Sequence, residues 1–288
     1  MTSIVLTAPA KVNLFLKVLG KRTDGYHNLH TLFERISLAD EIKLTRIPKG
    51  ISLSSDKFIT ARAKDNIAFK AAEAILSHAK VQGGVRIEIS KRIPIAAGLG
   101  GGSSDAAAVL EGINKLYCLD IPNCVLRRIG SKLGADVPFF LLHTPYAIGR
   151  GIGDKLRAVD SRLKLWHLLI YPGFKVATKD VYKELDKNLT WVSGGDKMTF
   201  PKRWNDAEGL LWNDLEGVVA GKRPVIGKII QCLASSLGKR AIVSGSGPSV
   251  FCLYKTRKGA IQAKERLFRS VSARVRKRWQ AFIVETEA

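Results

Sequence analysis

The sequence predicts an α+β protein organised as two domains. The chain has 288 residues, and at roughly 150 residues per domain this length suggests one large domain or two ordinary ones. Apolar residues make up 46% and charged residues 25% of the chain, which is the composition of a globular protein. Strand-like and helix-like segments follow one another in mixed order, which favours α+β over a doubly wound parallel sheet. A weakly marked boundary near residue 160 gives predicted domains at residues 1–160 and 161–288.

The first predicted elements come from apolar periodicity in the N-terminal half. In residues 12–19 apolar and polar residues alternate, which predicts a strand with one buried face, and Lys11 and Asn13 share its other face. Further strands are predicted at residues 3–7, 31–38, 41–46 and 85–89, with Ala39-Asp40 separating the second and third of these. Apolar residues at helical spacing predict helices at residues 65–80, 104–117 and 125–133.

The C-terminal half continues the mixed order. A short apolar run predicts a buried strand at residues 165–171. Helices are predicted at residues 224–237 and 259–270, and strands at residues 241–244, 249–254 and 282–285. Residues 188–204 are polar, contain Gly194-Gly195 and are predicted to form a loop or an insertion.

The charge of the chain is unusual. Lys and Arg number 47 against 25 Asp and Glu, a net charge of +22, and residues 255–278 carry ten basic side chains against Glu265 alone. Such a field attracts nucleotides, nucleic acid or acidic membranes, but a solvated basic face is the simpler explanation. The four cysteines are scattered and predict free thiols in a reducing compartment. No apolar run reaches about 18 residues and no signal peptide is seen, so we expect a cytoplasmic protein with no membrane partner.

The strongest local signal is the glycine-rich segment PIAAGLGGGSSDAAA at residues 94–108. Its glycines lie between a predicted strand and a predicted helix, where Ser103 and Ser104 occupy the expected N-cap positions. Glycines let backbone N–H groups approach a ligand, and the start of a helix adds unpaired donors, so the segment predicts a phosphate-binding loop. It has no Walker-type lysine, and Ser103 stands where a dinucleotide fingerprint needs Gly or Ala. A glycine hinge without a ligand is the alternative.

Three other segments carry candidate chemistry. Asp136 lies in GADVPFFL, residues 134–141, where it is either a functional carboxylate or a helix cap. SGSGPSVF, residues 244–251, predicts a tight turn between two strands. DGYH, residues 24–27, predicts a polar turn that presents Tyr26 and His27.

Together these four segments, in this order, resemble the GHMP kinases. The matching sequences are APAKVNLFLKVLGKRTDGYHNLHTLFE at residues 8–34, the glycine-rich segment, LGADVPFF at residues 133–140, and SGSGPSVF. The resemblance covers nearly the whole chain except about residues 186–206. It implies a two-domain GHMP kinase fold, with an N-terminal ATP-binding domain similar to the second domain of ribosomal protein S5 and a ferredoxin-like C-terminal substrate domain.

The PAKVNL and DGYH segments resemble the branch of the superfamily that acts on a cytidyl substrate. The implied reaction transfers the γ-phosphoryl group of ATP to the 2-hydroxyl of 4-diphosphocytidyl-2-C-methyl-D-erythritol, a step of non-mevalonate isoprenoid biosynthesis. Mg²⁺ is expected with ATP, while the resemblance leaves the metal ligands and the oligomeric state open.

The resemblance also implies site residues. The family's catalytic lysine corresponds to Lys11, and its catalytic acid corresponds to Asp136, the base for the substrate hydroxyl. The implied substrate-binding residues are Asn13, Tyr26, His27, Thr178 and Tyr182. The implied ATP-binding residues are Asn66 and the continuous loop Pro94, Ile95, Ala96, Ala97, Gly98, Leu99, Gly100, Gly101, Gly102, Ser103 and Ser104.

Two other functions remain compatible with the sequence. One is a basic nucleic-acid-binding protein built on an S5-like fold, which the charge supports. Against it, the basic residues lack interleaved aromatic residues, and a binding protein has no need of Lys11, Asp136 and the glycine loop together. The other is a sister GHMP kinase with another small alcohol substrate, against which the DGYH segment argues.

Overall fold

The computed structural model describes residues 2–188, 200–201 and 203–287, so the loop or insertion predicted at 188–204 lies mostly outside the described residues. The chain forms two compact units that interleave along the sequence. Unit 1 comprises residues 1–10, 38–95 and 100–143, and unit 2 comprises residues 11–37, 96–99 and 144–288. The two longest strands, β1 (Ser3–Lys21) and β2 (His27–Ile47), contribute residues to both units. A domain boundary near residue 160 stays a prediction.

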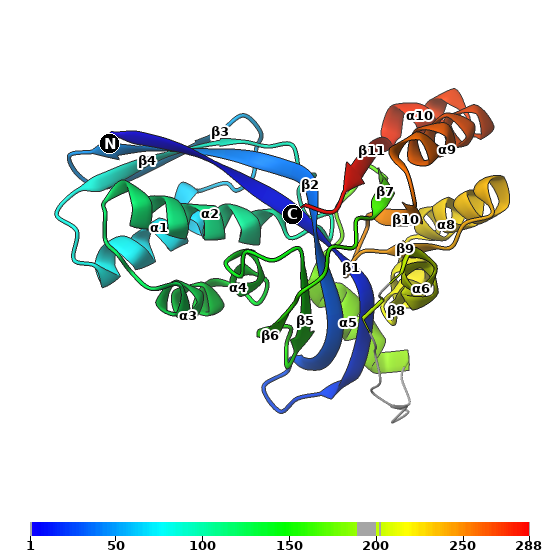
Figure 1. Ribbon diagram of the computed structural model, residues 1–288, viewed down its shortest axis with the longest axis horizontal. Helices are drawn as coiled ribbons and strands as arrows, with labels where there is room; N and C mark the ends of the chain where they lie inside the picture. The colour runs from blue at the N-terminus through cyan, green and yellow to red at the C-terminus, as the bar shows by residue number, and fades with distance from the viewer. Residues whose placement is uncertain (1, 189–199, 202, 288) are drawn as a thin grey trace. The chain divides into compact units, whose positions relative to one another are not determined.

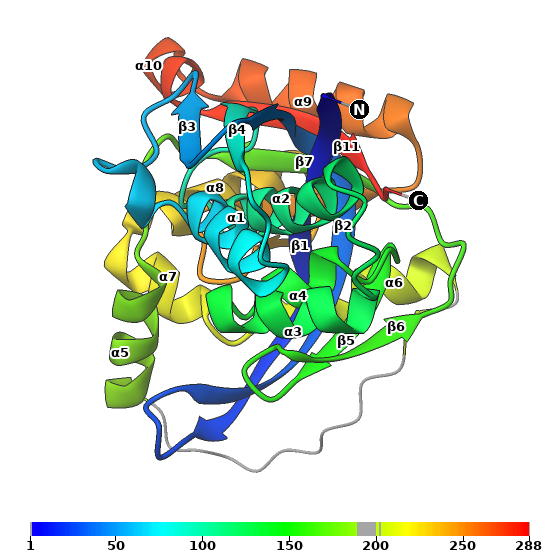
Figure 2. The same ribbon diagram turned by 90° about the vertical axis from the view of Figure 1, so that its left-hand side faces the viewer.

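Unit 1 is a sheet covered by helices. The end of β2 pairs antiparallel with β4 (Gly84–Ser90), and β4 pairs parallel with β3 (Ile51–Ser55). Helices α1 (Ile67–His78) and α2 (Gly101–Leu116) run side by side on one face of these strands (Figures 1 and 2). The short helix η1 (Ala63–Asp65) precedes α1, and α3 (Asn123–Leu133) and α4 (Val137–Phe140) follow α2. Apolar side chains of the strands and helices, such as Leu44, Ile75 and Val109, form its core.

Unit 2 contains a group of strands around β2 and a separate four-stranded sheet. β5 (Tyr146–Arg150) pairs antiparallel with β2 and with β6 (Lys155–Val159), while β8 (Trp212–Asn213) pairs parallel with β1. The separate sheet has the order β11-β7-β10-β9 and its pairs are antiparallel. Its strands are β7 (Trp166–Tyr171), β9 (Ala241–Val243), β10 (Val250–Tyr254) and β11 (Gln280–Glu285).

Helices α8 (Pro224–Leu237) and α9 (Arg257–Ser270) cover one face of this sheet (Figure 1). The sequence of elements β7, α8, β9, β10, α9, β11 and the strand order 4-1-3-2 make a ferredoxin-like arrangement, as the resemblance implied. The remaining helices of the described part of unit 2 are α5 (Thr178–Asn188), α6 (Trp204–Leu210), α7 (Glu216–Lys222) and α10 (Ala273–Arg278). In the described residues no helix has the length and apolar character that a membrane span requires.

The structure corrects three sequence predictions. Residues 3–7 and 12–19 belong to one strand, β1, and residues 31–38 and 41–46 belong to one strand, β2. β2 continues through Asp40 because its carboxylate is hydrogen-bonded inside the fold, where it accepts from the backbone N–H groups of Arg92 and Ile93 at 2.6 and 2.8 Å. α2 begins at Gly101 rather than at Ser104, so Gly100 is its N-cap and the serines lie in the first turn.

Candidate active site

The glycine-rich segment leads directly into α2. Gly100 has a φ of +68°, which an L side chain rarely adopts, and it is the N-cap residue of α2. The first intrahelical bond joins the Ser104 N–H to the Gly100 carbonyl, so the preceding N–H groups have no partner within the helix. A Cβ atom on Gly101 would lie 3.0 Å from Ile93 Cγ2, a contact so tight that the Ile93 side chain would have to shift. The loop and helix start therefore form a concentrated set of N–H donors for an anion.

Two buried polar groups beside this helix start lack partners in the described residues. The Oγ atom of Ser104, a residue only 1% exposed, has no hydrogen-bond partner. Asn66 caps α1 because its Oδ1 accepts from the Ala68 N–H at 2.9 Å, but its Nδ2 has no partner. Buried polar atoms are almost always hydrogen-bonded, so both atoms are suited to a polar ligand.

A buried charged cluster supports the first turn of α2 from behind. Lys91 Nζ donates to Asp105 Oδ2 at 2.8 Å and also to Asp40, and all three residues are under 5% exposed. Burial lowers the pKa of Lys91, but the two carboxylates outweigh it and leave this pKa raised. Burial raises the pKa of Asp105 to about 7, with Lys91 opposing this shift and Asp40 adding to it. A Cβ on Gly101 would lie 3.4 Å from Lys91 Nζ, so the cluster adjoins the loop.

Asp136 lies in the segment between α3 and α4, close to the start of α2. It occupies the N-cap position of α4, but its side chain makes no capping hydrogen bond, so capping does not explain the residue. A Cβ atom on Gly134 would lie 3.3 Å from Ile67 Cδ1 and 3.8 Å from Ser103 Oγ. The Asp136 segment therefore lies next to Ser103, in the first turn of α2, and next to Ile67, the first residue of α1 after its cap Asn66.

Lys11 and Asn13 form a buried pair in unit 2. They are 5% and 2% exposed, and Lys11 Nζ donates to Asn13 Oδ1 at 2.7 Å. Asn13 Nδ2 donates to Thr31 Oγ1 at 2.8 Å, and Thr31 Oγ1 donates to the carbonyl of Phe15 at 2.7 Å. The Lys11 ammonium also lies over the Phe33 ring, 5.2 Å from its centroid. The common face predicted for Lys11 and Asn13 is confirmed, and this chain of bonds fixes both side chains.

The second glycine turn, residues 244–249, packs against the first half of the glycine-rich segment. Ser244 Oγ donates to the Gly98 carbonyl at 3.0 Å, and the Ser249 N–H donates to the Ala97 carbonyl at 3.2 Å. A Cβ atom on Gly245 would lie 3.2 Å from Asn13 Oδ1 and 3.6 Å from Lys11 Nζ. The predicted turn between two strands is confirmed, and it also forms a wall beside the Lys11–Asn13 pair.

His27 and Tyr182 stack on each other in unit 2. Their ring centroids are 4.8 Å apart, and His27 Nε2 lies 2.7 Å from Asp186 Oδ1. Partial burial opposes ionisation of Asp186, but hydrogen bonds from Lys21 and His27 outweigh it and lower the pKa of this carboxyl. Tyr26 is 60% exposed, and its ring makes no aromatic contact with the described residues. The structure thus joins His27 to Tyr182 and leaves the Tyr26 ring open to solvent.

Thr178 connects α5 to the second glycine turn. It is the first residue of α5, it is exposed, and its Oγ1 lies 2.7 Å from Ser246 Oγ. Within unit 2 the structure therefore links Thr178 to the turn that flanks Lys11 and Asn13. Within unit 1 it places Asn66, the loop from Gly100 to Ser104 and the Asp136 segment next to one another. Pro94 and Ile95 belong to unit 1, and residues 96–99 belong to unit 2.

Sequence reasoning missed the residues that hold these groups in place. Thr31, Asp186 and the pair Lys91–Asp105 carry no local motif, and their partners lie 14 to 159 positions away. The one usable signal was Asp105, a carboxylate that lies between the loop serines and the apolar run Ala106–Leu110. In the described part of the chain, no group of three His, Cys, Asp or Glu residues is arranged to hold a metal ion.

Known proteins resemble this chain in sequence and in fold. The model of the GHMP kinases N terminal domain matches residues 66–144, and that of the GHMP kinases C terminal domain matches residues 200–273. A 4-diphosphocytidyl-2-C-methyl-D-erythritol kinase of Pelobacter propionicus is 43% identical, over 99% of this chain and 100% of its own. The enzyme of the same name from Geobacter sulfurreducens is 42% identical, over 92% of this chain and 95% of its own.

Solved structures extend the comparison to the fold. A crystal structure of 4-(cytidine 5'-diphospho)-2C-methyl-D-erythritol kinase superposes with a TM-score of 0.78 at 33% identity, covering 99% of this chain and 100% of that one. Homoserine kinase from Cytophaga hutchinsonii has a TM-score of 0.71 at 19% identity, covering 100% and 95% of the two chains, and shows the fold alone. The chain therefore has the two-domain GHMP kinase fold and belongs to the GHMP kinases, in the family of the 4-diphosphocytidyl-2-C-methyl-D-erythritol kinases.

Proposed function

We propose that this protein transfers the γ-phosphoryl group of ATP to the 2-hydroxyl of 4-diphosphocytidyl-2-C-methyl-D-erythritol. The proposal includes a place in non-mevalonate isoprenoid biosynthesis and in the cytoplasm. The observation that carries it is the buried Lys11–Asn13 pair beside a glycine turn, in a chain 43% identical to a kinase of that name. A lysine held this way has one defined position for its charge, which suits stabilisation of a transferring phosphoryl group.

ATP is assigned to the glycine-rich segment and the start of α2. The N–H groups from Gly100 to Ser103 would bind the phosphate oxygens, since they precede the first intrahelical hydrogen bond and are donors without partners in the helix. The unpaired Nδ2 of Asn66 would donate to an acceptor of the adenine ring. The carbonyls of Ala97 and Gly98 are held by the second glycine turn, which fixes the backbone leading into the phosphate loop.

Phosphoryl transfer depends mainly on positioning and on neutralising charge. Asp136 would take the proton of the 2-hydroxyl as that oxygen bonds to the γ-phosphorus and the bond to the ADP oxygen breaks. Lys11 would stabilise the negative charge of the transferring group, and Asn13 would fix the orientation of both Lys11 and the substrate. Thr178, Tyr26, His27 and Tyr182 would hold the rest of the substrate, with the aromatic rings contacting the cytosine.

Mg²⁺ is expected to accompany the nucleotide, and the Ser104 hydroxyl fits this role. Its oxygen is buried and has no hydrogen-bond partner among the described residues, and Mg²⁺ prefers hard oxygen ligands. Because the described residues hold no cluster of three metal-binding side chains, we assign most of the ligands to the phosphates. When bound, the ion would neutralise charge on the phosphate groups.

The test is ATP consumption with a panel of alcohols. We expect turnover with 4-diphosphocytidyl-2-C-methyl-D-erythritol and no comparable turnover with homoserine or mevalonate. Turnover with another member of the panel alone would support a sister kinase instead. An absence of turnover, together with nucleic-acid binding that weakens steeply with salt, would support a basic nucleic-acid-binding protein.

The assigned roles are tested by single and double variants. Asp136→Asn should keep the fold and ATP binding but lose roughly 10²–10⁴-fold in turnover, because the hydroxyl loses its base. Lys11→Met should also lose turnover, and the double variant should lose less than the product of the single losses if both groups act on one transfer step. Wild-type turnover in Asp136→Asn would remove this carboxylate from the mechanism.

A further inference from the structure

Residues 213–216 of unit 2 span the end of β8 and the start of α7, and their polar side chains bind backbone groups of other strands. Asp214 Oδ2 accepts from the Val18 N–H of β1 at 2.8 Å. Glu216 Oε2 accepts from the Val243 N–H of β9 at 3.0 Å. The segment therefore joins β1 to β9, the strand that leads into the second glycine turn.

Asn213 makes the closest set of these contacts. It is 7% exposed, and its Nδ2 donates to the carbonyls of Val243 and Gly245 at 2.7 and 2.8 Å. Its Oδ1 accepts from the Leu215 N–H at 2.9 Å. Two acceptors at one end of the amide and a donor at the other define its orientation. Asn213 therefore holds two carbonyls of the chain, one on each side of Ser244.

Gly245 is the point at which the turn meets the Lys11–Asn13 pair. Its φ is +55°, and a Cβ atom on it would lie 3.2 Å from Asn13 Oδ1 and 3.6 Å from Lys11 Nζ. Because Lys11 Nζ donates to Asn13 Oδ1, the turn covers the hydrogen bond that fixes the ammonium group. A displaced Gly245 backbone would leave space beside this bond, and a long lysine side chain has several rotamers that can use it.

The bonds within the turn set its shape, while Asn213 sets its place. The Ser244 N–H donates to the Ser249 carbonyl and the Gly247 N–H donates to the Ser244 carbonyl, both at 2.9 Å. These bonds alone would let the turn move as a unit. Asn213 ties it to β1, because β8 pairs with β1 and Asn213 lies opposite Leu16.

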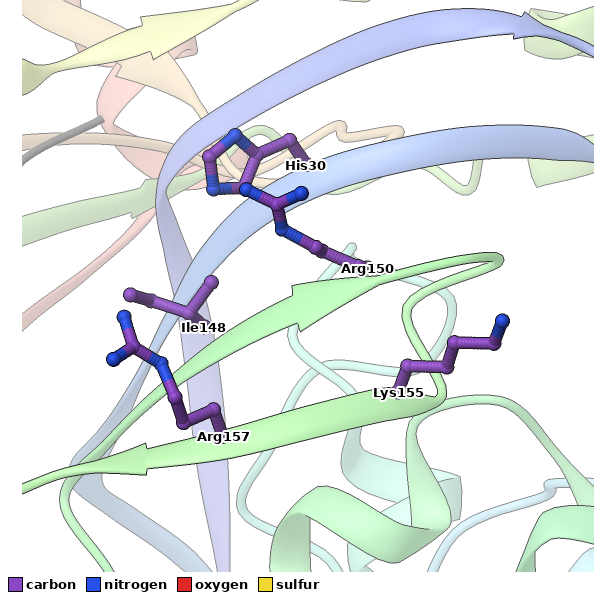
Figure 3. Close-up of a pocket in the computed structure, with 5 residues that line it drawn as sticks. All are labelled: His30, Ile148, Arg150, Lys155 and Arg157. Atoms are coloured by element: carbon purple, nitrogen blue, oxygen red, sulfur yellow. The ribbon is translucent and has the colours of Figure 1, made fainter. Parts of the chain in front are cut away.

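Figure 3 shows a pocket on the opposite face of β2, also within unit 2. Its volume is about 310 Å³, and His30 and Ile148 are among the residues that line it. His30 precedes Thr31, the partner of Asn13, and Ile148 pairs with Leu32, so both side chains point away from the Thr31 face. The pocket is therefore separate from the Lys11–Asn13 pair, whose wall is the second glycine turn.

We propose that Asn213 is a positioning residue for phosphoryl transfer, which holds the Lys11 ammonium in place through the Gly245 backbone. This inference rests on the function proposed for Lys11, since a positioning residue acts through a catalytic group. Asn213 is bonded to backbone atoms, so it needs no contact with ATP or with the alcohol substrate. Its effect belongs to the transfer step, where a displaced charge stabilises the transition state less well.

The first experiment measures steady-state kinetics of the full chain carrying Asn213→Ala, with ATP and 4-diphosphocytidyl-2-C-methyl-D-erythritol. Because a misplacement of about 1 Å can cost roughly 10²-fold, kcat should fall about 10- to 100-fold. The KM for ATP should change by less than about threefold, since Asn213 does not touch the nucleotide loop.

Two variants serve as controls. Asp214→Ala removes the side-chain bond to Val18 from the same segment, and Asn114→Ala removes the same amide from α2, where it bonds to the backbone of Ile121. Both controls should lower the urea midpoint of unfolding and keep the wild-type kcat. A fall of kcat in Asp214→Ala as large as that in Asn213→Ala would overturn the proposal, and so would wild-type kcat in Asn213→Ala.

Coupling to Lys11 distinguishes positioning from general loosening of the fold. In a Lys11→Met background, Asn213→Ala should change kcat by less than about twofold, because the group that it holds is already absent. If Asn213→Ala caused its full loss in that background as well, it would act on something other than Lys11, and the proposal would be wrong.

A spectroscopic measurement requires no substrate. In protein that contains ¹⁵N-labelled lysine, the Nζ signal of Lys11, assigned with Lys11→Met, should shift in Asn213→Ala and stay in place in both controls. An unmoved signal in Asn213→Ala would contradict the proposal. If this variant does not fold, Gly245→Ala tests the same contact from the turn, since its Cβ would press on Asn13 Oδ1 at 3.2 Å and should shift the signal.

An unmoved Lys11 signal in folded Gly245→Ala would likewise overturn the proposal. The same signal keeps this inference distinct from the proposed function. A wild-type protein without turnover of the cytidyl substrate would contradict the proposed function, while the Lys11 signal would still report whether Asn213 holds the ammonium group.

Discussion

Tyr182 stacks on His27 with ring planes inclined by 27° and centroids 4.8 Å apart, although 155 positions separate the two residues. His27 in turn lies 2.7 Å from Asp186, one helical turn beyond Tyr182 on α5. Helix α5 therefore contributes both a ring that packs on the imidazole and a carboxylate that fixes its orientation. This set of three side chains is the best-defined part of the proposed cytosine pocket.

Tyr182→Ala should weaken substrate binding while leaving turnover at saturation nearly unchanged. Base stacking contributes roughly 1–3 kcal/mol, which is on the order of 5- to 150-fold in affinity. Tyr182→Phe should be nearly silent, because the ring face rather than the hydroxyl makes the contact. Steady-state kinetics of both variants at saturating ATP provides the measurement. An unchanged KM in Tyr182→Ala, or an equal loss in Tyr182→Phe, would exclude the stacking role.

Asp186→Asn should raise the substrate KM roughly 3- to 10-fold with little change in kcat, because a charge-assisted hydrogen bond to His27 becomes a neutral one. The matched control is Asp180→Asn, an exposed carboxylate in the first turn of the same helix. Kinetics with the cytidyl substrate distinguishes the two variants. If both variants behave alike, the carboxylate at position 186 has no part in positioning His27.

Ser104→Ala should reduce ATP affinity by roughly tenfold without destabilising the protein. The hydroxyl is buried and unpaired among the described residues, so its removal leaves the free energy of unfolding unchanged or slightly raised, whereas a bound nucleotide or ion loses a ligand. Ser77→Ala is the control, because it removes the hydroxyl of an exposed serine of α1 that has no assigned role in the site. Calorimetry with ATP and urea unfolding measure both effects, and unchanged ATP affinity in Ser104→Ala would remove the hydroxyl from the site.

Asp105→Asn should change how stability depends on pH. Burial raises the pKa of Asp105 from 3.8 to about 7, so the folded state binds this proton more tightly than the unfolded state. The resulting stabilisation is complete below about pH 4 and is lost as the pH rises through 7. The free energy of unfolding of wild-type protein, relative to the variant, should therefore fall by roughly 1–3 kcal/mol between pH 5 and 8. Urea unfolding at several pH values tests this, and parallel curves for the two proteins would contradict it.

Local patterns in the sequence predicted the parts of the fold that depend on local physics. Period-two alternation placed Lys11 and Asn13 on one face, and the structure joins them by a hydrogen bond. Helical spacing placed α1, α2, α8 and α9 with shifts of a few residues. The glycine-rich segment was identified because glycines and a helix start are adjacent in the chain.

The features that the sequence patterns did not predict depend on contacts between distant residues or on backbone conformation. The sequence pattern predicts a break between strands at Asp40, yet contacts with Lys91 and two backbone N–H groups, all about 50 positions away, keep it buried within β2. Strand β6, KLRAV, is short and has no buried residue, so it lacks the signal of a buried face and depends on pairing with β5. The start of α2 was placed three residues late because capping preferences favour serine, whereas the left-handed turn at Gly100 decides where the helix begins.

The contact between Ser244 and Gly98 has a consequence for the order in which the chain folds. Residues 96–99 lead into the proposed phosphate loop, but the groups that hold their carbonyls, Ser244 and Ser249, lie 146 and 152 positions later in the chain. A nascent chain that ends at residue 143 already contains all of unit 1, including α2, without these partners. Closing such a distant contact is a late event in folding. The backbone that leads into the proposed phosphate loop is therefore fixed only after the C-terminal half of the chain has been made.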